Sequence, residues 1–233
     1  MEIRFLATIM HELKTPLSCI KLGLMQLKDN RNGAMNHRQK ELAGDINDAT
    51  ERLFKIVNEL LDCTQAETGC IRVNPIPTSP TAIVAHAIDS VKILAAQKEV
   101  DLQVIAPSGL SKVLGDVEKT GWVVVNFLSN ALRHSIERST IIIELAEKNE
   151  RVIFSVQDFG KGIDEQYQKR LFERYFRVPT DNDNRAADGD NKGRSGLGLA
   201  ISKEIIESQD GEIWVESVLG KGSIFSFSLK QSI

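Results

Sequence analysis

The sequence has no apolar run long enough to cross a membrane. A spanning helix needs about 18 or more consecutive apolar residues, and no stretch of the 233 residues approaches that length. Cysteine is scarce too: Cys19, Cys63 and Cys70 are odd in number and lack the paired spacing of metal ligands. These absences favour reduced, packed thiols in a cytoplasmic protein over a disulfide-stabilised secreted one.

An excess of charge of one sign is also lacking. The chain carries 29 basic and 32 acidic residues, for a net charge of −3. Nothing in that balance favours a nucleic acid or an anionic membrane surface as partner. The 42% hydrophobic content suits one large domain or two modest ones. We therefore expect no nucleic-acid partner, and any membrane attachment would belong to an input region outside this stretch.

Residues 5–20 carry the pattern of an amphipathic helix. At about 100° per residue, an apolar stripe lies within about 40° of Leu13 and contains Leu6, Ile9, Leu17, Ile20, Leu24 and Leu27. His11 and Thr15 fall roughly opposite the stripe, with Glu12 beside them. Pro16 should bend the helix directly after this group. The pattern predicts an imidazole held out into solvent.

A second helical pattern follows the polar, turn-prone residues 29–33. It contains a heptad seam of Leu42, Ile46, Ala49, Leu53, Ile56, Leu60 and Cys63. A helical hairpin cannot bury both stripes alone, so we expect a homodimeric four-helix bundle. The alternative is a hairpin packed on its own domain. Leu22 and Met25 project on roughly the same outward side as His11, about two to four turns further along the helix. They are a hypothetical docking surface for a partner protein, or else they widen the bundle core.

Closely spaced prolines at 75, 77 and 80 end the helical seam. We place the helical hairpin at 1–69, a linker at 70–78 and a second domain at 79–233. In that domain we expect helices at 81–97 and 117–135, strands at 101–106, 112–115, 140–147 and 151–158, and a closing β-hairpin at 212–230. Mixed helices and antiparallel hairpins favour an α/β sandwich over a doubly wound parallel sheet.

Polar side chains that suit a nucleotide gather in the second domain. Asn126, Asn130 and Arg133 share one helical face. Amide oxygens suit Mg²⁺, and a cation on the same face can contact phosphate. Asp158 ends a strand and precedes a glycine turn, where a buried carboxylate can accept a hydrogen bond from an adenine amino group.

A polar run at 179–195 lacks apolar periodicity and predicts a mobile loop. It leads into a glycine-rich helix start at Gly196, Leu197, Gly198 and Leu199. Backbone N–H groups at such a helix end can bind a triphosphate.

Five stretches, in order, resemble the sequence boxes of bacterial sensor histidine kinases. They are HELKTPL from His11, NFLSNALRHS from Asn126, DFGKGID from Asp158, LFERYFRV from Leu171, and GRSGLGLAI from Gly193. The nucleotide boxes also resemble those of the wider ATPase family of gyrase and the Hsp90 chaperones. Two departures in the first box, Met10 and Lys14, remove no reacting group. Arg133 replaces a frequent Lys and keeps its charge, and Arg194 stands where a further Gly is common.

The resemblance implies a role for each matching residue. His11 would take the γ-phosphate of ATP, Glu12 would orient the ring, and Thr15 would position water for dephosphorylation. Asn126 and Asn130 would hold Mg²⁺. The remaining ATP contacts would come from Arg133, His134, Asp158, Gly160, Gly162, Ile163, Phe172, Arg177, Gly196, Leu197, Gly198 and Leu199.

The fold implied is a phospho-acceptor hairpin followed by a Bergerat-type α/β sandwich. The function implied is autophosphorylation at His11 with Mg·ATP, followed by transfer to an aspartate of a response regulator, in a transmitter core. One alternative is a nucleotide-binding dimeric scaffold in which no phosphate reaches His11. Another is a conformational ATPase of the chaperone or topoisomerase kind, although such a protein has no need of the His11 box.

Overall fold

The computed structural model describes residues 20, 22–24, 26–27, 35–47, 49–50, 53, 71, 73–179 and 196–232. The chain divides into two compact units, with the main break between Cys70 and Ile71. His11, Glu12, Thr15, Met25 and the polar run 180–195 lie outside the described residues. In the described ranges, no helix combines the length and apolar character needed to cross a membrane.

The described residues of the N-terminal unit are helical within 20–27 and 37–53, and residues 35 and 36 precede the second helix. The second helix begins with a reciprocal cap: the Asn36 side chain accepts from Gln39 N, and the Gln39 side chain accepts from Asn36 N, both at 2.9 Å. This capping box satisfies backbone donors that the first helical turn leaves unpaired. It explains why the helix starts here, after the predicted turn.

The seam residues that the structure describes are exposed in the single chain. Leu42, Ile46 and Leu53 expose 44%, 49% and 46% of their surface, whereas Ala43 and Thr50 are buried. The apolar residues of the predicted seam thus lie on a different face from the side chains that the single chain buries.

The second unit contains four described helices and seven strands. The helices are α3 Pro80–Gln97, α4 Val117–His134, α5 Glu165–Gln168 and α6 Gly198–Glu207. The strands are β1 Ile76–Thr78, β2 Asp101–Ile105, β3 Val113–Gly115, β4 Thr140–Lys148, β5 Arg151–Asp158, β6 Glu212–Val218 and β7 Gly222–Lys230.

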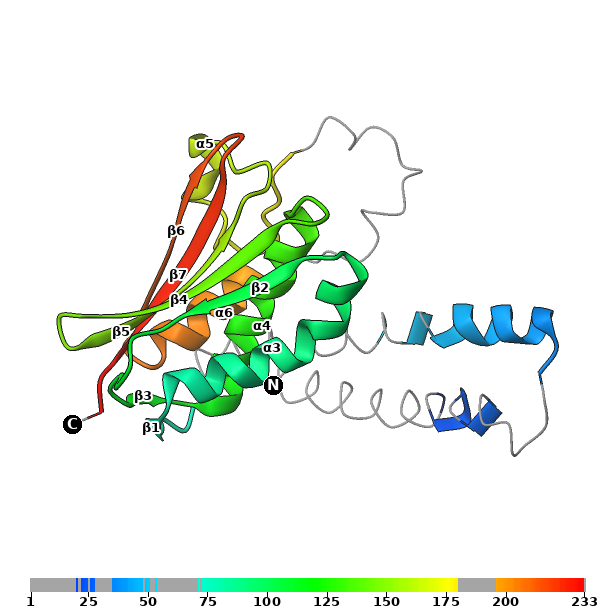
Figure 1. The fold of residues 1–233 in the computed structure, drawn as a ribbon, viewed down its shortest axis with the longest axis horizontal. Coiled ribbons are helices and arrows are strands. Elements are labelled where there is room, and N and C mark those ends of the chain that lie inside the picture. Colours follow the sequence, from blue (N-terminus) through cyan, green and yellow to red (C-terminus); the bar gives the residue numbers. More distant parts are fainter. Residues whose placement is uncertain are drawn as a thin grey trace, which may run out of the picture. The chain divides into compact units, whose positions relative to one another are not determined.

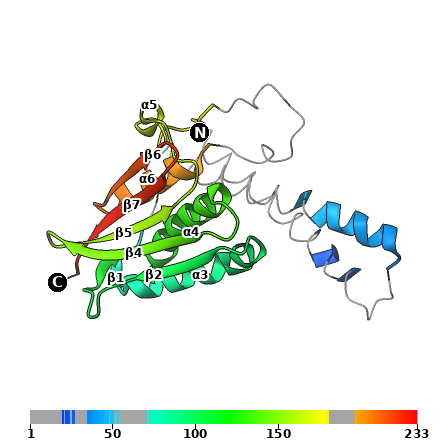
Figure 2. The same cartoon turned by 45° about the horizontal axis from the view of Figure 1, so that its top comes forward.

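Five strands form one sheet in the order β2-β4-β5-β7-β6. Only the β2–β4 pair is parallel; the other three pairs are antiparallel. Helices α3, α4 and α6 lie against one face of this sheet (Figures 1 and 2). The α/β sandwich prediction is confirmed. The sequence patterns missed α5 and β1. Strand β1 lies inside the region expected to be linker, and it pairs with β3.

The core forms between the sheet and α4 because alternate residues of β4 and β5 point inward. Four phenylalanines dominate it. Phe127 of α4 meets Phe225 and Phe227 of β7 with ring centroids 5.5 and 6.0 Å apart, and Phe154 stacks on Phe227 at 4.5 Å. Such ring pairs contribute roughly 0.5–1.5 kcal/mol each beyond area burial. The packing fixes α4 across the sheet.

The sandwich has two ends along α4 and α6, which run in opposite directions. At the far end, where α4 begins and α6 ends, the Gln209 side-chain oxygen accepts from Asp116 N at 2.6 Å and from the Thr120 hydroxyl at 3.4 Å. Its amide nitrogen donates to Ile205 O at 3.0 Å. Asp116 caps α4 by accepting from Lys119 N. Polar groups at this end are therefore satisfied by the chain itself.

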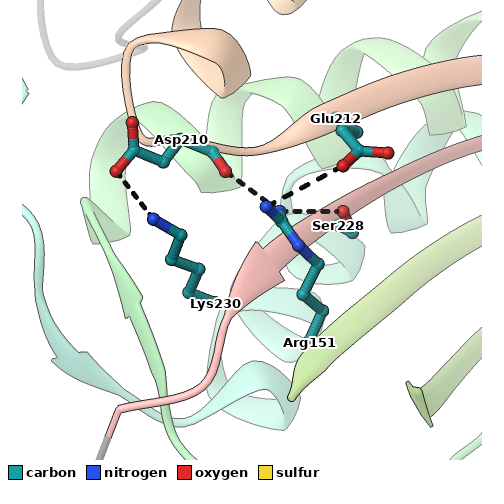
Figure 3. Close-up of polar contacts among 5 residues, drawn as sticks. All are labelled: Arg151, Asp210, Glu212, Ser228 and Lys230. Atoms are coloured by element: carbon teal, nitrogen blue, oxygen red, sulfur yellow. Dashed lines mark hydrogen bonds and ion pairs between the residues drawn. The ribbon is translucent and has the colours of Figure 1, made fainter. Parts of the chain in front are cut away.

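The turn after α6 is held from the sheet side as well (Figure 3). Arg151 donates to Asp210 O at 2.9 Å and to the Ser228 hydroxyl at 3.4 Å, and it lies 3.8 Å from the Glu212 carboxylate. Lys230 pairs with the Asp210 carboxylate at 3.0 Å. The C-terminal end of α6 is thereby attached to both β5 and β7.

Candidate nucleotide-binding site

The other end of the sandwich brings together the end of α4, the turn after β5 and the start of α6. A Cβ on Gly160 would lie 2.3 Å from His134 O, and one on Gly198 would lie 2.8 Å from the Asn126 side-chain oxygen. Both distances are below what real Cβ atoms show. Glycine at these positions lets two backbone segments approach α4 closely. We call this region the nucleotide end.

Asn126 connects α4 to α6. Its amide nitrogen donates to the Ser202 hydroxyl at 2.9 Å, and that hydroxyl donates to Gly198 O at 2.9 Å. The amide oxygen of Asn126 lies beside Gly198. Asn130 and Arg133, half-buried on the same helix, follow one and two turns later. The sequence motifs missed Ser202, which is fully buried. Its position four residues after Gly198 does place it on the same face of the helix.

Asp158 is the only buried carboxylate among the described residues, with 4% of its surface exposed. Gly160 N donates to its Oδ1 at 2.9 Å. Burial raises the pKa of the Asp158 carboxyl above its ordinary 3.8, while backbone hydrogen bonds from Gly160 and Ser223 oppose that rise. A carboxylate has about four acceptor positions, so capacity remains for a ligand N–H. The expectation of a buried carboxylate here is confirmed.

The glycine turn after Asp158 is pressed against the β6–β7 hairpin. Gly162 has a φ of +67°, and a Cβ there would lie 2.1 Å from Val218 O. Gly222 has a φ of +102°, and its Cβ would lie 2.0 Å from Asp158 O. Both positions exclude larger residues on conformation and on space. The turn is therefore shaped by contacts from a strand pair that is remote in sequence.

Ser217 joins that turn to the hairpin. Its hydroxyl accepts from Ile163 N and donates to Gly222 O, both at 2.8 Å, and it lies 2.9 Å from the Ser223 hydroxyl. Gln168 of α5 donates to Ile163 O at 3.0 Å and to Ser217 O at 2.8 Å. Sequence motifs missed these residues. The sequence did contain one indication of Ser217: it follows Ile213 and Val215 at alternate positions, so it is expected on the inward side of the strand.

The start of α6 differs from the start of the other helices that the structure describes. Side chains of Ser79, Asp116 and Asp164 cap α3, α4 and α5, whereas no side chain caps α6. An uncapped helix start directs backbone donors and the positive end of the helix dipole at a potential anion. Gly196, just before it, has a φ of +70° and accepts from Tyr175 N at 3.0 Å.

The segment after α5 reaches α6 through an ion pair. Arg174 contacts Glu204 through two nitrogens, at 2.7 and 3.2 Å. Phe172 is half-buried and Arg177 is exposed on this segment. The structure thus brings Gly160 against His134 and Gly198 against Asn126. It holds Asp158 to Gly160 and Ile163 to Ser217. Phe172 and Arg177 lie on the segment between α5 and α6, and their contact with a nucleotide stays a prediction.

This arrangement, a mixed five-stranded sheet with helices α3, α4 and α6 on one face (Figure 1), is an α/β sandwich. Residues 115–233 match the family described as histidine kinase-, DNA gyrase B- and HSP90-like ATPases. Residues 1–69 match the His Kinase A phospho-acceptor domain.

Two relatives of this chain are named as histidine kinases. The circadian input-output kinase CikA of Synechococcus elongatus is 30% identical over 224 residues, which are 95% of this chain and 29% of CikA. The sensor kinase RcsC of Escherichia coli is 31% identical over 225 residues, 95% of this chain and 22% of RcsC. The crystal structure of full-length ShkA with AMPPNP has the same fold, with a TM-score of 0.77 and 24% identity over 98% of this chain and 46% of ShkA.

The chain belongs to the histidine kinases, and its two matched regions form the transmitter core of a sensor kinase. It spans less than a third of the length of CikA and RcsC. Because the C-terminal region belongs to an ATPase family, ATP is the nucleotide class of this domain.

Proposed function

We propose that this chain phosphorylates itself on His11 with ATP and passes the phosphoryl group to an aspartate of a response regulator. The observation that carries the proposal is the composition of the nucleotide end. The uncapped start of α6, the buried carboxylate of Asp158 and the asparagines of α4 all lie in a domain of the ATPase family. The match of residues 1–69 to a phospho-acceptor domain supports His11 as the acceptor.

Each part of the site has a proposed role. The Asp158 carboxylate accepts a hydrogen bond from the adenine amino group, and the start of α6 near Gly198 receives phosphate oxygens. Arg133 places a positive charge near the end of α4, the helix that carries Asn126 and Asn130. Phosphoryl transfer depends mainly on such alignment and charge neutralisation.

Mg²⁺ fits the asparagines of α4. Because the Asn126 amide nitrogen is bound by Ser202, its oxygen is the atom left to act as an acceptor or ligand, and amide oxygens are hard donors of the kind Mg²⁺ takes. We propose that Asn130 and Asn126 hold the ion. When bound, it neutralises negative charge on the triphosphate.

In the transfer step, a ring nitrogen of His11 attacks the γ-phosphorus. The N–P bond forms as the bond to the β–γ bridging oxygen breaks, and ADP leaves. Glu12 accepts the proton of the other ring nitrogen and orients the ring. We propose that Thr15 positions water in the reverse activity, dephosphorylation of the regulator.

We also propose that the chain acts as a homodimer. The exposed Leu42, Ile46 and Leu53 support this, because a second copy can cover such a heptad seam. Leu22, in the hypothetical docking surface, is 57% exposed, but Leu27 is equally exposed, so exposure does not single it out. The docking surface stays a hypothesis.

The test is detection of acid-labile phosphate, by intact mass or radiolabel, after incubation with Mg·ATP. We expect labelled wild type and unlabelled His11→Gln and Asn130→Asp. His11→Gln should still bind ATP, whereas Asn130→Asp should bind it weakly because a carboxylate repels the triphosphate. Wild type that binds ATP but stays unlabelled would instead support the nucleotide-binding scaffold.

A further inference from the structure

The last turn of α4 is held by a lysine from a different helix. An α-helix leaves its last four carbonyls without backbone partners. In α4, Ala131 O accepts from Ser135 N at 2.8 Å and from the Ser135 hydroxyl at 2.6 Å. The next two carbonyls, Leu132 O and Arg133 O, accept from the Lys98 ammonium at 3.0 and 3.3 Å. A side chain from more than 30 residues away therefore completes this helix end.

The base of Lys98 is itself fixed. It is the C-cap of α3, where its backbone N donates to Leu94 O and Ala95 O at 3.3 and 3.2 Å. Its carbonyl accepts from Arg138 N at 3.4 Å, in the turn that follows α4. The residue is half-buried. Lys98 thus binds backbone on both sides of the end of α4 while anchored to α3.

The turn that Lys98 holds belongs to the nucleotide end. His134 O lies against Gly160, and Arg133 is one of the two residues whose carbonyls Lys98 binds. The C-terminal end of a helix carries a partial negative charge, which a nearby cation offsets. A triphosphate brought to this end of the sandwich would otherwise meet that negative charge. Because a helix-end charge acts on the charged triphosphate and not on neutral adenosine, loss of the Lys98 ammonium should weaken ATP binding more than adenosine binding.

We propose that Lys98 is a positioning residue for the triphosphate. It fixes the last turn of α4 so that the Arg133 guanidinium reaches phosphate, and it offsets the negative helix end beside the site. The proposal rests on the nucleotide-binding part of the proposed function. It does not depend on phosphate reaching His11.

The test compares the affinities of the full chain for Mg·ATP and for adenosine by calorimetry. Lys98→Met keeps most of the aliphatic stem and removes the charge and the donors. We expect it to weaken ATP binding about three- to tenfold, the size of one helix-end charge interaction, and to change adenosine binding less than about twofold. Lys98→Arg should recover most of the loss. Lys92→Met, an exposed lysine on the same helix, is the matched control.

Thermal unfolding of each variant shows that the compared proteins are folded. Unchanged ATP affinity in Lys98→Met would overturn the proposal. So would an equal loss of ATP and adenosine affinity, because that pattern means a general disturbance of the pocket. Wild type that binds ATP without becoming phosphorylated would count against the kinase reaction and leave Lys98 in its role. Wild type that binds no ATP would overturn both.

Discussion

The two ends of the sandwich use polar groups in opposite ways. At the far end, the Gln209 side chain accepts from Asp116 N and donates to Ile205 O, and Arg151 donates to Asp210 O. At the nucleotide end, α6 starts without a capping side chain and Asp158 is buried with acceptor capacity to spare. The far end contributes to stability, whereas the nucleotide end leaves groups for a ligand. Substitutions at the nucleotide end should therefore lower ATP affinity, whereas substitutions at the far end should lower the free energy of unfolding.

The largest effect on binding is expected from Gly162→Ala. The new Cβ would lie 2.1 Å from Val218 O in a residue with a φ of +67°. A left-handed non-glycine residue alone costs about 1–2 kcal/mol, and here the clash is with backbone that cannot turn away. We expect ATP affinity to fall by about a hundredfold or more, roughly 2.7 kcal/mol, in equilibrium titrations.

Gly220→Ala is the control for that experiment. Gly220 has a φ of +81°, but nothing lies within 4 Å of its added Cβ. It shares the conformational strain of Gly162 without the clash. If both variants lose ATP affinity equally, strain in the hairpin explains the effect, and the close approach of the glycine turn does not matter.

Gln209→Ala should have the converse effect. It leaves Asp116 N and the buried Thr120 hydroxyl without their acceptor. Unsatisfied buried donors cost about 1–3 kcal/mol, so we expect a loss of about 2 kcal/mol in the free energy of unfolding, measured in urea. ATP affinity should stay within about twofold of wild type.

Glu207→Ala on the same helix is its matched control. Glu207 is exposed, and its contact with Lys203 is 3.8 Å long. It should change stability by less than about 0.5 kcal/mol. A tenfold loss of ATP affinity in Gln209→Ala would break the comparison, because it would show that the far end controls the site.

The third prediction uses the pKa of Asp158, which burial raises above 3.8. The folded protein therefore binds this proton more readily than the unfolded chain, so the contribution of Asp158 to stability rises as the pH falls from the raised value towards 3.8. Binding should follow the opposite trend, since only the carboxylate accepts well from the adenine amino group. Acidification through this window should weaken ATP binding.

Asp158→Asn separates that titration from the titration of ATP. At pH 7 it should weaken ATP binding about tenfold, as expected for losing a hydrogen bond to a charged group. Protonation of ATP affects both proteins equally, so it cancels in the ratio of the variant's ATP dissociation constant to that of wild type. This ratio should decrease as the pH falls, because wild-type Asp158 becomes protonated. A ratio that is constant between pH 4 and 7 would contradict the assigned role of Asp158.

Sequence reasoning located the sandwich, the Asp158 turn and the α4 face because each depends on local periodicity or on a short motif. It missed Ser217, Ser202 and Lys98, whose roles depend on partners far along the chain. Lys98, for example, acts on carbonyls 34 and 35 residues away. No local pattern encodes such a contact, since any lysine at a helix end resembles a solvated one. Tertiary packing decides which lysine meets an unpaired carbonyl.

The smallest effect is expected from Lys230→Met at the far end. Lys230 and Asp210 are paired at 3.0 Å, but their side chains are 53% and 78% exposed. Exposed pairs typically contribute less than about 1 kcal/mol and are screened by salt. We expect a loss of less than about 0.5 kcal/mol in the free energy of unfolding, with ATP affinity unchanged.

Arg151→Met is the variant with which the effect of Lys230→Met is compared. Arg151 is only 26% exposed and donates to Asp210 O and to the Ser228 hydroxyl. Its loss removes partners from backbone and side chain together, so the expected destabilisation is about 1–2 kcal/mol. If Lys230→Met were as destabilising as Arg151→Met, long-range charge would hold the far end. A clear difference between the two would show that the hydrogen bonds of Arg151, rather than long-range charge, hold the C-terminal end of α6 in place.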